Sequence, residues 1–385
     1  MSQSITLRGI TWNHTRGYLP MVATAQRFHE LHPEVSLIWE VRSLQAFGDA
    51  PLKELARRYD LLVVDHPFIG QAAEEGLLLP LDVFLPAAFL ADQAQNSVGA
   101  SHASYQYEGR QWALAIDAAA PVSGWRPDLL EKSGARPPAS WEDLLEMARA
   151  GLVLFPAVPI DSLMHFYMLC IALGAELFKQ EGRLVEENIG GEALHRLREL
   201  LQLCGPECLH RNPITVWETL AASHSVAFCP FAYGYSNYAR PGYAAQVLEF
   251  GGLVQMNGVP LRSVLGGAGL AVSAQSTNRT AALQYAQFVA SERCQQTLYF
   301  DSGGQPGHRG AWLDAETNRR SHGFFSRTLP VLDAACLRPR HAWYPCFQEE
   351  AATVVHRFLG SGGSEMQTVQ ELNHLYRKSR GSRRA

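Results

Sequence analysis

The chain has 385 residues, of which 47% are hydrophobic and 18% are charged, a composition typical of a globular protein. This length exceeds what one ordinary hydrophobic core supports, so we expect two domains of about 150–200 residues each. A net charge of −4 gives no electrostatic reason to bind nucleic acid or an anionic membrane. No apolar run approaches the roughly 18 residues of a membrane span.

The N-terminus and the cysteines bear on the compartment. No basic stretch followed by an apolar core opens the chain, so no secretory signal is visible. Seven cysteines leave at least one unpaired within the chain. Cys204 and Cys208 form a C-x3-C pair, but no second cysteine or histidine pair at metal-ligand spacing accompanies it. We expect no metal site and mostly buried free thiols, which disfavours an oxidising compartment.

The first hundred residues alternate helix and strand patterns. Apolar residues recur at helical spacing over 19–32, and residues 35–41 alternate as a half-buried strand does. A short helix over 51–58 leads into DLLVVD at 60–65, a continuous apolar run typical of a buried parallel strand. A helix over 69–76, closed by glycine, follows. This order predicts a doubly wound α/β lobe.

A polar loop at residues 9–18, GITWNHTRGY, separates a short apolar run from the first helix. It carries an aromatic ring, a carboxamide, an imidazole and a guanidinium within five residues: Trp12, Asn13, His14 and Arg16. Open α/β sheets bind ligands just beyond the carboxyl ends of their strands, so this loop is a candidate site. Asp65 and His66 follow the strand at 60–65 and are expected at the same edge. The alternatives are an incidental polar loop and, for Asp65, capping of the next helix.

The rest of the chain continues to alternate strands and helices without tandem repeats or long linkers. We expect strands over 112–116, 226–229 and 265–272, and helices over 140–150, 162–173, 192–203 and 280–291. Ser140 is an expected N-cap, with Asp143 at the third helical position. The two domains are therefore expected to be joined by short crossings.

In their order and spacing, several pieces of the chain resemble the extracellular solute-binding proteins of ABC importers, in the maltose-type, sugar-binding branch. They are EEGLLLPLD (74–82), YEGRQWALAID (107–117), WRPDLLEKSGARPPASWEDLLEMA (125–148), LGAELF (173–178), AALQYAQFVASERCQQTLYFDSGGQPGHRGAW (281–312) and the helix near 348–358. The resemblance implies a two-lobed periplasmic-binding-protein clamshell, each lobe a doubly wound sheet flanked by helices, with a hinge between the lobes. The implied lobes are 1–116 plus 264–326 and 117–263 plus 327–385.

The resemblance also implies a function without chemistry on the ligand. The substrate-binding component of an ABC importer captures a small polar solute in the inter-lobe cleft by hinge closure and delivers it to a membrane permease. We accordingly expect a non-enzymatic monomer with no cofactor and no nucleic-acid partner. Its location would be periplasmic if it is exported and cytoplasmic otherwise. Gly-Trp-Arg-Pro at 124–127 departs from the family, whose helix there usually begins with Asn after an aromatic residue.

Further candidate contacts come from the same resemblance. They are Asp117 at the first crossing, Tyr167 in a helix whose aromatics often line the cleft, Tyr233 and Tyr235 in an aromatic loop, Gly267 in a glycine-rich strand, and His308 in GGQPGH. Core packing competes as an explanation for the aromatic rings, Trp12 included. Aromatic rings suit a sugar or polyol, whereas Arg16 and His14 suit a carboxylate. A sugar acid satisfies both, with a neutral sugar close behind.

Two alternative functions, from other classes of protein, remain open. A thiaminase-like clamshell enzyme would place a nucleophilic cysteine in the cleft, and Cys229 is the only candidate thiol in the right region. A small buried residue at the end of a strand is the favoured explanation of Cys229. A cytoplasmic sensor that hands ligand-induced closure to a protein partner is the other alternative.

Overall fold

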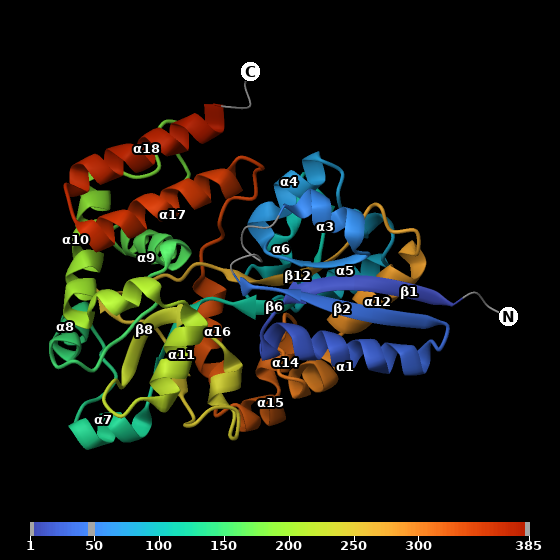
Figure 1. Ribbon diagram of the computed structural model, residues 1–385, viewed down its shortest axis with the longest axis horizontal. Coiled ribbons are helices and arrows are strands. Elements are labelled where there is room, and N and C mark those ends of the chain that lie inside the picture. Colours follow the sequence, from blue (N-terminus) through green and yellow to red (C-terminus); the bar gives the residue numbers. More distant parts are fainter. Residues whose placement is uncertain (1–3, 45–50, 382–385) are drawn as a thin grey trace. The chain divides into compact units, whose positions relative to one another are not determined.

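A computed structural model describes residues 4–44 and 51–381. The chain divides into two compact α/β units, which are described separately (Figure 1). Unit 1 comprises Met1–Ala119, Leu265–Ser321 and Arg340–Ala342, and unit 2 comprises Ala120–Val264, His322–Pro339 and Trp343–Ala385. In the described ranges no helix is long and apolar enough to cross a membrane.

These unit bounds differ by a few residues from the lobes expected from the sequence. The expected first crossing followed residue 116, whereas the structure keeps Asp117 in unit 1. The reason is that strand β6 (Leu114–Ala119) stays paired with strand β12 (Gly266–Val272) as far as Ala119. The short return to unit 1 at Arg340–Ala342 was not expected.

Unit 1 is built on one five-stranded sheet in the order β2-β1-β3-β12-β6. The strands besides β6 and β12 are β1 (Ile5–Trp12), β2 (Val35–Arg42) and β3 (Leu61–Val64). β1 runs parallel to both β2 and β3, while β12 runs antiparallel to both β3 and β6. β1, β2, β3 and β6 therefore all end at the same edge of the sheet, called here the carboxyl edge of unit 1.

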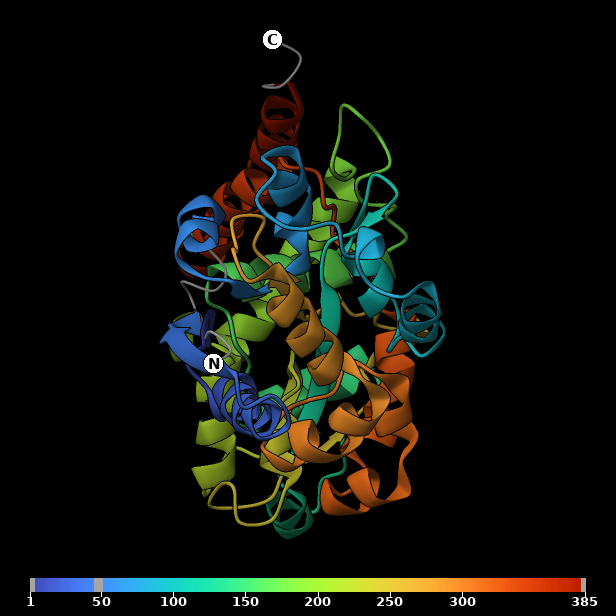
Figure 2. The ribbon, with the colours of Figure 1, turned by 90° about the vertical axis from the view of Figure 1, so that its right-hand side faces the viewer.

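Helices cover both faces of this sheet. On one face α1 (Thr15–Leu31) and α12 (Arg279–Ala290) pack against Leu61 and Val63, and on the other α3 (Leu52–Arg58) and α4 (Ile69–Glu74) pack against Leu62 and Val64 (Figures 1 and 2). Because side chains of a strand alternate between faces, a strand buried on both faces is apolar throughout. This double burial explains the uninterrupted LLVV of β3.

Shorter elements complete unit 1. They are η1 (His66–Phe68), η2 (Leu81–Val83), α5 (Ala87–Gln95), α6 (Ser101–Ser104), β4 (Gln106–Tyr107), β5 (Arg110–Gln111), α13 (Glu292–Cys294), the π-helical η5 (Gln295–Tyr299), α14 (Arg309–Leu313) and α15 (Ala315–Arg320).

Unit 2 has a three-stranded sheet in the order β8-β7-β9, with both neighbours antiparallel to β7. Its strands are β7 (Pro121–Trp125), β8 (Phe228–Tyr233) and β9 (Glu249–Gly251), beside a small β10–β11 hairpin (Gln255–Met256 and Val259–Pro260). Val153 forms a parallel bridge with Phe228, which extends the sheet on the free side of β8.

Helices form most of unit 2. They are α7 (Pro127–Ser133), α8 (Trp141–Arg149), α9 (Pro159–Ala172), α10 (Glu187–Cys204), η3 (Pro206–His210), α11 (Pro213–Ala222), η4 (Ser236–Ala239), α16 (Phe324–Ala334), α17 (Tyr344–Ser361) and α18 (Glu365–Gly381). α9 packs against both α10 and α17, and every residue from 161 to 170 is buried. The expected cap of α8 is confirmed, because Ser140 and Asp143 form a reciprocal capping box.

Candidate functional site

The carboxyl edge of unit 1 gathers most of the candidate residues of that unit. The loop after β1 carries Asn13, the loop after β3 begins with Asp65, and β6 brings Asp117 to the same edge. Gly267 lies at the start of β12, directly opposite Ala118. Strand topology alone therefore brings together groups as far apart in sequence as Asn13 and Gly267, at the edge where open α/β sheets bind ligands.

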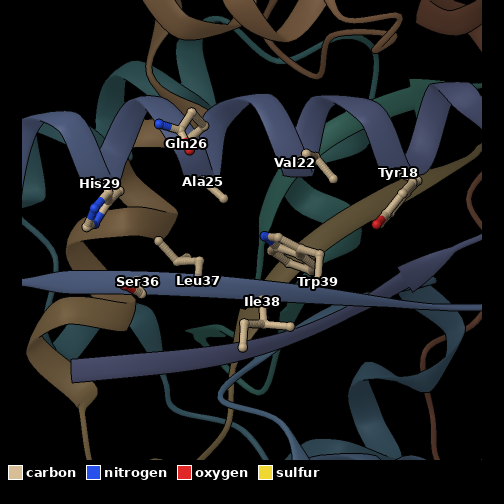
Figure 3. Close-up of a pocket in the computed structure, with 9 residues that line it drawn as sticks. All are labelled: Tyr18, Val22, Ala25, Gln26, His29, Ser36, Leu37, Ile38 and Trp39. Atoms are coloured by element: carbon tan, nitrogen blue, oxygen red, sulfur yellow. The ribbon is translucent and has the colours of Figure 1, made fainter. Parts of the chain in front are cut away.

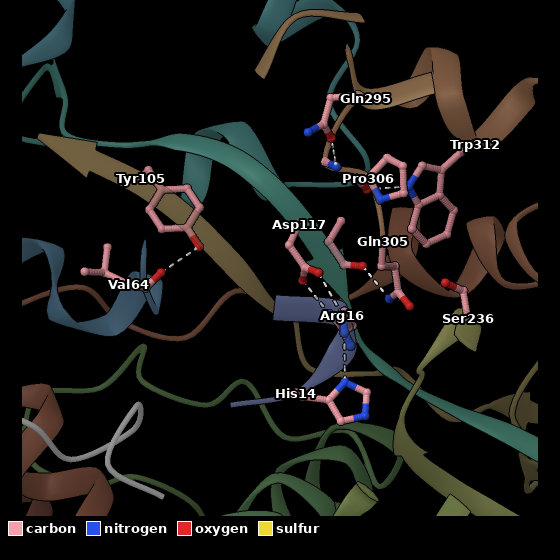
Figure 4. Close-up of polar contacts among 12 residues, drawn as sticks. His14, Arg16, Val64, Tyr105, Asp117, Ser236, Gln295, Gln305, Pro306 and Trp312 are labelled. Atoms are coloured by element: carbon pink, nitrogen blue, oxygen red, sulfur yellow. Dashed lines mark hydrogen bonds and ion pairs between the residues drawn. The ribbon is translucent and has the colours of Figure 1, made fainter. Parts of the chain in front are cut away.

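Arg16 and Asp117 form a buried ion pair at this edge (Figure 4). Arg16 Nε donates to Asp117 Oδ2 at 2.7 Å, and Arg16 Nη2 donates to Oδ1. The two side chains are only 4% and 0% exposed. Burial raises the pKa of Asp117, and the Arg16 guanidinium opposes that rise. The charge of Arg16 is thus compensated within unit 1, a use that the sequence did not reveal.

The other residues of the first loop have different environments. His14 caps α1, where its Nδ1 accepts a hydrogen bond from Arg16 N at 3.0 Å. Burial, with a contribution from Arg16, lowers the pKa of His14 to about 4, so the imidazole is neutral at pH 7. Trp12 is buried under the loop against Gly17, where an added Cβ would lie 2.3 Å from the ring. Asn13 is exposed.

Asp65 and His66 occupy the end of β3 in different ways. Asp65 accepts a hydrogen bond from His66 N at 2.9 Å and caps η1. Capping of the next helix is the alternative to ligand contact that the sequence leaves open for Asp65. The Asp65 side chain keeps 15% of its surface exposed, whereas that of His66 is fully buried. The His66 ring lies edge-on to Tyr105, with centroids 6.4 Å apart.

Gly267 is required by close packing of the backbone. Its φ is +107°, and an added Cβ would lie 2.3 Å from the Asp117 carbonyl oxygen. Gln305, which sequence reasoning missed, supports the same strand end because its Nε2 donates to Ala118 O at 2.8 Å (Figure 4). In the sequence, its place directly after Gly303 and Gly304 is the signal that could have pointed to it.

His308 lies apart from the other candidates of unit 1. Pro306 bridges to Asp117, and Gly307 N donates to Ile116 O at 3.1 Å, so this segment runs back along β6 away from the carboxyl edge. His308 caps α14, and its Nε2 lies 3.4 Å from Asp92 Oδ2. Its position favours a structural role.

The candidates of unit 2 also separate. Tyr233 ends β8 and is partly exposed, whereas Tyr235 is 4% exposed and packs edge-on to Tyr238. Gly234 between them is needed for close approach, because an added Cβ would lie 2.9 Å from Val122. Tyr167 is in the core, edge-on to Phe178 at 5.3 Å.

Cys229 has the environment of a structural thiol. It is fully buried in β8, and this burial raises the pKa of its thiol well above the ordinary value. The nucleophilic form of cysteine is the thiolate, so this environment argues against the enzyme alternative. Among the described residues, no group of three or more His, Cys, Asp or Glu is placed to hold a metal ion.

A groove on the outer side of unit 1 contains none of the sequence candidates. It has a volume of about 370 Å³ and lies between α1 and the edge strand β2 (Figure 3). It is lined by Tyr18, Val22, Ala25, Gln26, His29, Ser36, Leu37, Ile38 and Trp39. Its lining combines apolar and polar side chains and contains no cluster of charged groups.

Two α/β units, each built on its own sheet, are the fold of the two-lobed periplasmic binding proteins. Solved structures of such proteins share this fold over the whole chain. The maltose-bound MalE3 of T. maritima has a TM-score of 0.85 at 17% identity, covering 97% of this chain and 100% of its own. An ABC transporter solute-binding protein of Agrobacterium radiobacter K84 gives 0.82 at 19%, covering 98% and 99%. The GacH receptor of Streptomyces glaucescens GLA.O gives 0.81 at 18%, covering 99% of each chain.

Residues 50–322 match the model of the bacterial extracellular solute-binding proteins. The chain belongs to this family. The resemblance and the fold class expected from the sequence are thereby confirmed, and the family is one of binding proteins rather than enzymes.

Proposed function

We propose that this protein is the substrate-binding component of an ABC importer and that its solute is a neutral sugar or polyol. Membership in the extracellular solute-binding family supports the first part. The second is supported by proteins of the same fold that were solved with maltose, ribitol and α-D-tagatose.

The ion pair between Arg16 and Asp117 is the observation that carries the choice of a neutral solute. A free guanidinium at this edge would favour an anionic solute, but Arg16 already makes two bonds to a buried carboxylate. The neighbouring His14 is neutral at pH 7, because burial lowers its pKa to about 4. The two residues that favoured a sugar acid in the sequence therefore supply no uncompensated positive charge.

We assign solute contact to the candidates that remain accessible or polar at the strand ends. Asn13, Asp65 and the backbone at Gly267 belong to unit 1, and Tyr233 belongs to unit 2. Carboxylate and carboxamide oxygens accept hydrogen bonds from sugar hydroxyls, and a tyrosine ring packs on the apolar face of a sugar. Trp12, His66, Tyr167 and Tyr235 serve mainly as packing residues.

Membership in the extracellular solute-binding family supports a mode of action. We propose that a monomer in the periplasm holds the solute between its two lobes, closes by a hinge motion and delivers the solute to a membrane permease. Solution scattering with and without the bound solute measures the closure. Stimulation of ATP hydrolysis by the reconstituted transporter measures the delivery step.

A thermal-shift and calorimetric panel tests the solute class. Maltose, ribitol and D-tagatose are compared with gluconate and galacturonate, because each binding solute stabilises the folded state by RT ln(1 + [L]/Kd). At a hundred times Kd this stabilisation is about 2.7 kcal/mol, which raises the melting temperature measurably. Binding of a neutral solute is expected. Binding of the acids alone would refute the neutral class, and a panel without any binding would count against the function itself.

A further inference from the structure

The hydroxyl group of Ser263 makes a long-range hydrogen bond close to the point where the chain leaves unit 2. Ser263 is 1% exposed, and its Oγ donates to Pro121 O at 2.7 Å across 142 residues of sequence. Pro121 lies two residues after Ala119, where the chain leaves unit 1, and Ser263 lies two residues before Leu265, where the chain returns to it. The bond therefore joins the first two segments by which the chain crosses between the units.

The usual local role of a serine hydroxyl does not account for this bond. The hydroxyls of Ser133, Ser321 and Ser361 donate to carbonyl groups three or four residues earlier in the chain, as serines at helix ends commonly do. Ser263 lies outside the helices, between β11 and β12. Its hydroxyl bond stabilises the arrangement of two segments that are distant in sequence, not a local turn.

The same two crossing segments are also joined to each other within unit 1. There Ala119, the last residue of β6, pairs with Gly266, the first residue of β12. Between the joined points, one segment contains only Ala120, and the other contains only Val264 and Leu265. All three of these residues are buried. Changes of backbone dihedral angle at these two crossings are therefore confined to very few residues.

A third crossing segment is bonded to the same serine. Cys336 N donates to Ser263 O at 2.7 Å, and Cys336 forms a parallel bridge with Val264. This third segment continues to Arg340, where the chain enters unit 1 again. Ser263 therefore bonds two other crossing segments, one through its side chain and one through its backbone. Loss of the hydroxyl would release the first crossing and leave the backbone bond in place.

We propose that Ser263 is a positioning residue for closure, because its hydroxyl couples the first crossing to the second and third so that they bend together. This inference rests on the proposed function, in which the two lobes close around the solute. Without the hydroxyl bond, the first crossing bends independently of the other two, and the solute-free protein samples more conformations. Closure then costs more conformational entropy, so the solute binds less tightly.

The test compares Ser263→Ala with Ser273→Ala. Ser273 is also fully buried, and its Oγ donates to Ala56 O at 2.6 Å across 217 residues, but both residues belong to unit 1 and Ser273 follows the far end of β12. Distances are measured between spin labels introduced as unnatural amino acids at the exposed positions of Lys53 in unit 1 and Lys132 in unit 2, with and without solute. Calorimetry measures the affinities for maltose, ribitol and D-tagatose.

The two variants are expected to differ in binding but not in stability. In Ser263→Ala the distance distribution of the solute-free protein should broaden and the affinity should fall about three- to tenfold, as for one lost hydrogen bond. In Ser273→Ala both quantities should stay as in the unaltered protein. Both variants should lower the melting temperature by a similar small amount, because each loses one buried hydrogen bond.

An unchanged distribution or an unchanged affinity in Ser263→Ala would overturn the proposal. Equal changes in Ser273→Ala would overturn it too, because they would show a general effect of lost stability. If the solute leaves the distribution of the unaltered protein unchanged, hinge closure itself is contradicted. If the unaltered protein binds none of the three solutes, the proposed function fails, whereas the width of the solute-free distribution still tests Ser263.

Discussion

Arg16 and Asp117 are 101 residues apart in the chain and share a two-point ion pair with 4% and 0% side-chain exposure. The pair joins the first turn of α1 to the last strand before the chain leaves unit 1. A charge buried this deeply is tolerated only with its partner, because the desolvation cost of each ion is several kcal/mol. The loop after β1 and the end of β6 are thereby held together.

Removing one partner of this pair is expected to destabilise unit 1. Arg16→Met leaves the Asp117 carboxyl buried without its cation, and a loss of about 3–5 kcal/mol in the free energy of unfolding is expected. Urea unfolding at pH 7 measures it. The control is Arg319→Met in the exposed pair of Arg319 with Glu316, which should leave the free energy of unfolding nearly unchanged, because solvent screens that pair. Equal losses of unfolding free energy in the two variants would show that the buried pair contributes no more to stability than the exposed pair.

Gly267 is expected to tolerate no side chain. Alanine there has to adopt a φ near +107° and places Cβ 2.3 Å from the Asp117 carbonyl oxygen. Gly109→Ala is the matched control, since Gly109 has a φ of +74° and nothing within 4 Å of an added Cβ. We expect Gly109→Ala to lower the free energy of unfolding by about 1 kcal/mol, because alanine disfavours a positive φ. Gly267→Ala should lower it clearly more, because the clash adds to the same conformational cost. Thermal or urea unfolding of both variants gives the difference, and equal costs would contradict the clash.

Periodicity predicted the elements well because each is decided locally. The continuous apolar run of β3, the alternation of β2 and the capping box at Ser140 all depend on neighbours in sequence. The placement of Asn13, Asp65 and Asp117 at a common edge is less local, but it follows from strand order once a parallel sheet is assumed.

The contacts that each side chain makes were not predictable from such local patterns. The pattern around Arg16 contains nothing about Asp117, and only the pairing of β6 with β12 brings the carboxylate within reach. Ser263 escaped notice for a related reason, because the carbonyl group that it bonds lies 142 residues away in the chain. Burial of Tyr235 but not of Tyr233 likewise depends on how the segment after β8 folds back.

The two tyrosines after β8 are expected to separate binding from stability. Tyr233→Ala removes a partly exposed ring at the strand end, so affinity for the neutral solutes should fall about tenfold with a small change in melting temperature. Tyr235→Ala removes a ring that is 4% exposed and should cost about 3–5 kcal/mol of stability. Calorimetry and unfolding of both variants test the assignment. A stable Tyr235→Ala protein that has lost binding would reverse the two roles.

Asp161, a buried residue in the first turn of α9, gives the protein a component of stability that falls as pH rises. Burial raises the pKa of Asp161 to about 8, above the ordinary value of about 3.8. The folded state therefore holds a proton that the unfolded state has released between about pH 4 and pH 8, and stability decreases across this window by up to about 1.4 kcal/mol per unit. Asp161→Asn removes the ionisation, so the difference in unfolding free energy between variant and unaltered protein should grow from pH 4 to pH 8.

Other titrating groups near Asp161 are the same in both proteins and cancel in this difference. They are His165 on α9, whose pKa burial lowers to about 3, and Cys229 on β8, whose thiol pKa burial raises well above its ordinary value. A difference that stays constant from pH 4 to pH 8 would mean that Asp161 is ionised in the folded protein.

The cysteines give a direct check on the enzyme alternative. All seven are free thiols, but Cys229 is fully buried with a raised pKa, whereas Cys346 is exposed. Because the thiolate is the reactive form, a thiol reagent at pH 7.5 should label Cys346 in the native protein and reach Cys229 only after unfolding. Cys346→Ala should abolish the fast phase, and Cys229→Ala should leave solute binding unchanged. Rapid labelling of native Cys229, coupled to loss of a catalytic activity, would support Cys229 as a catalytic nucleophile. It would contradict the assignment of the chain as a binding protein.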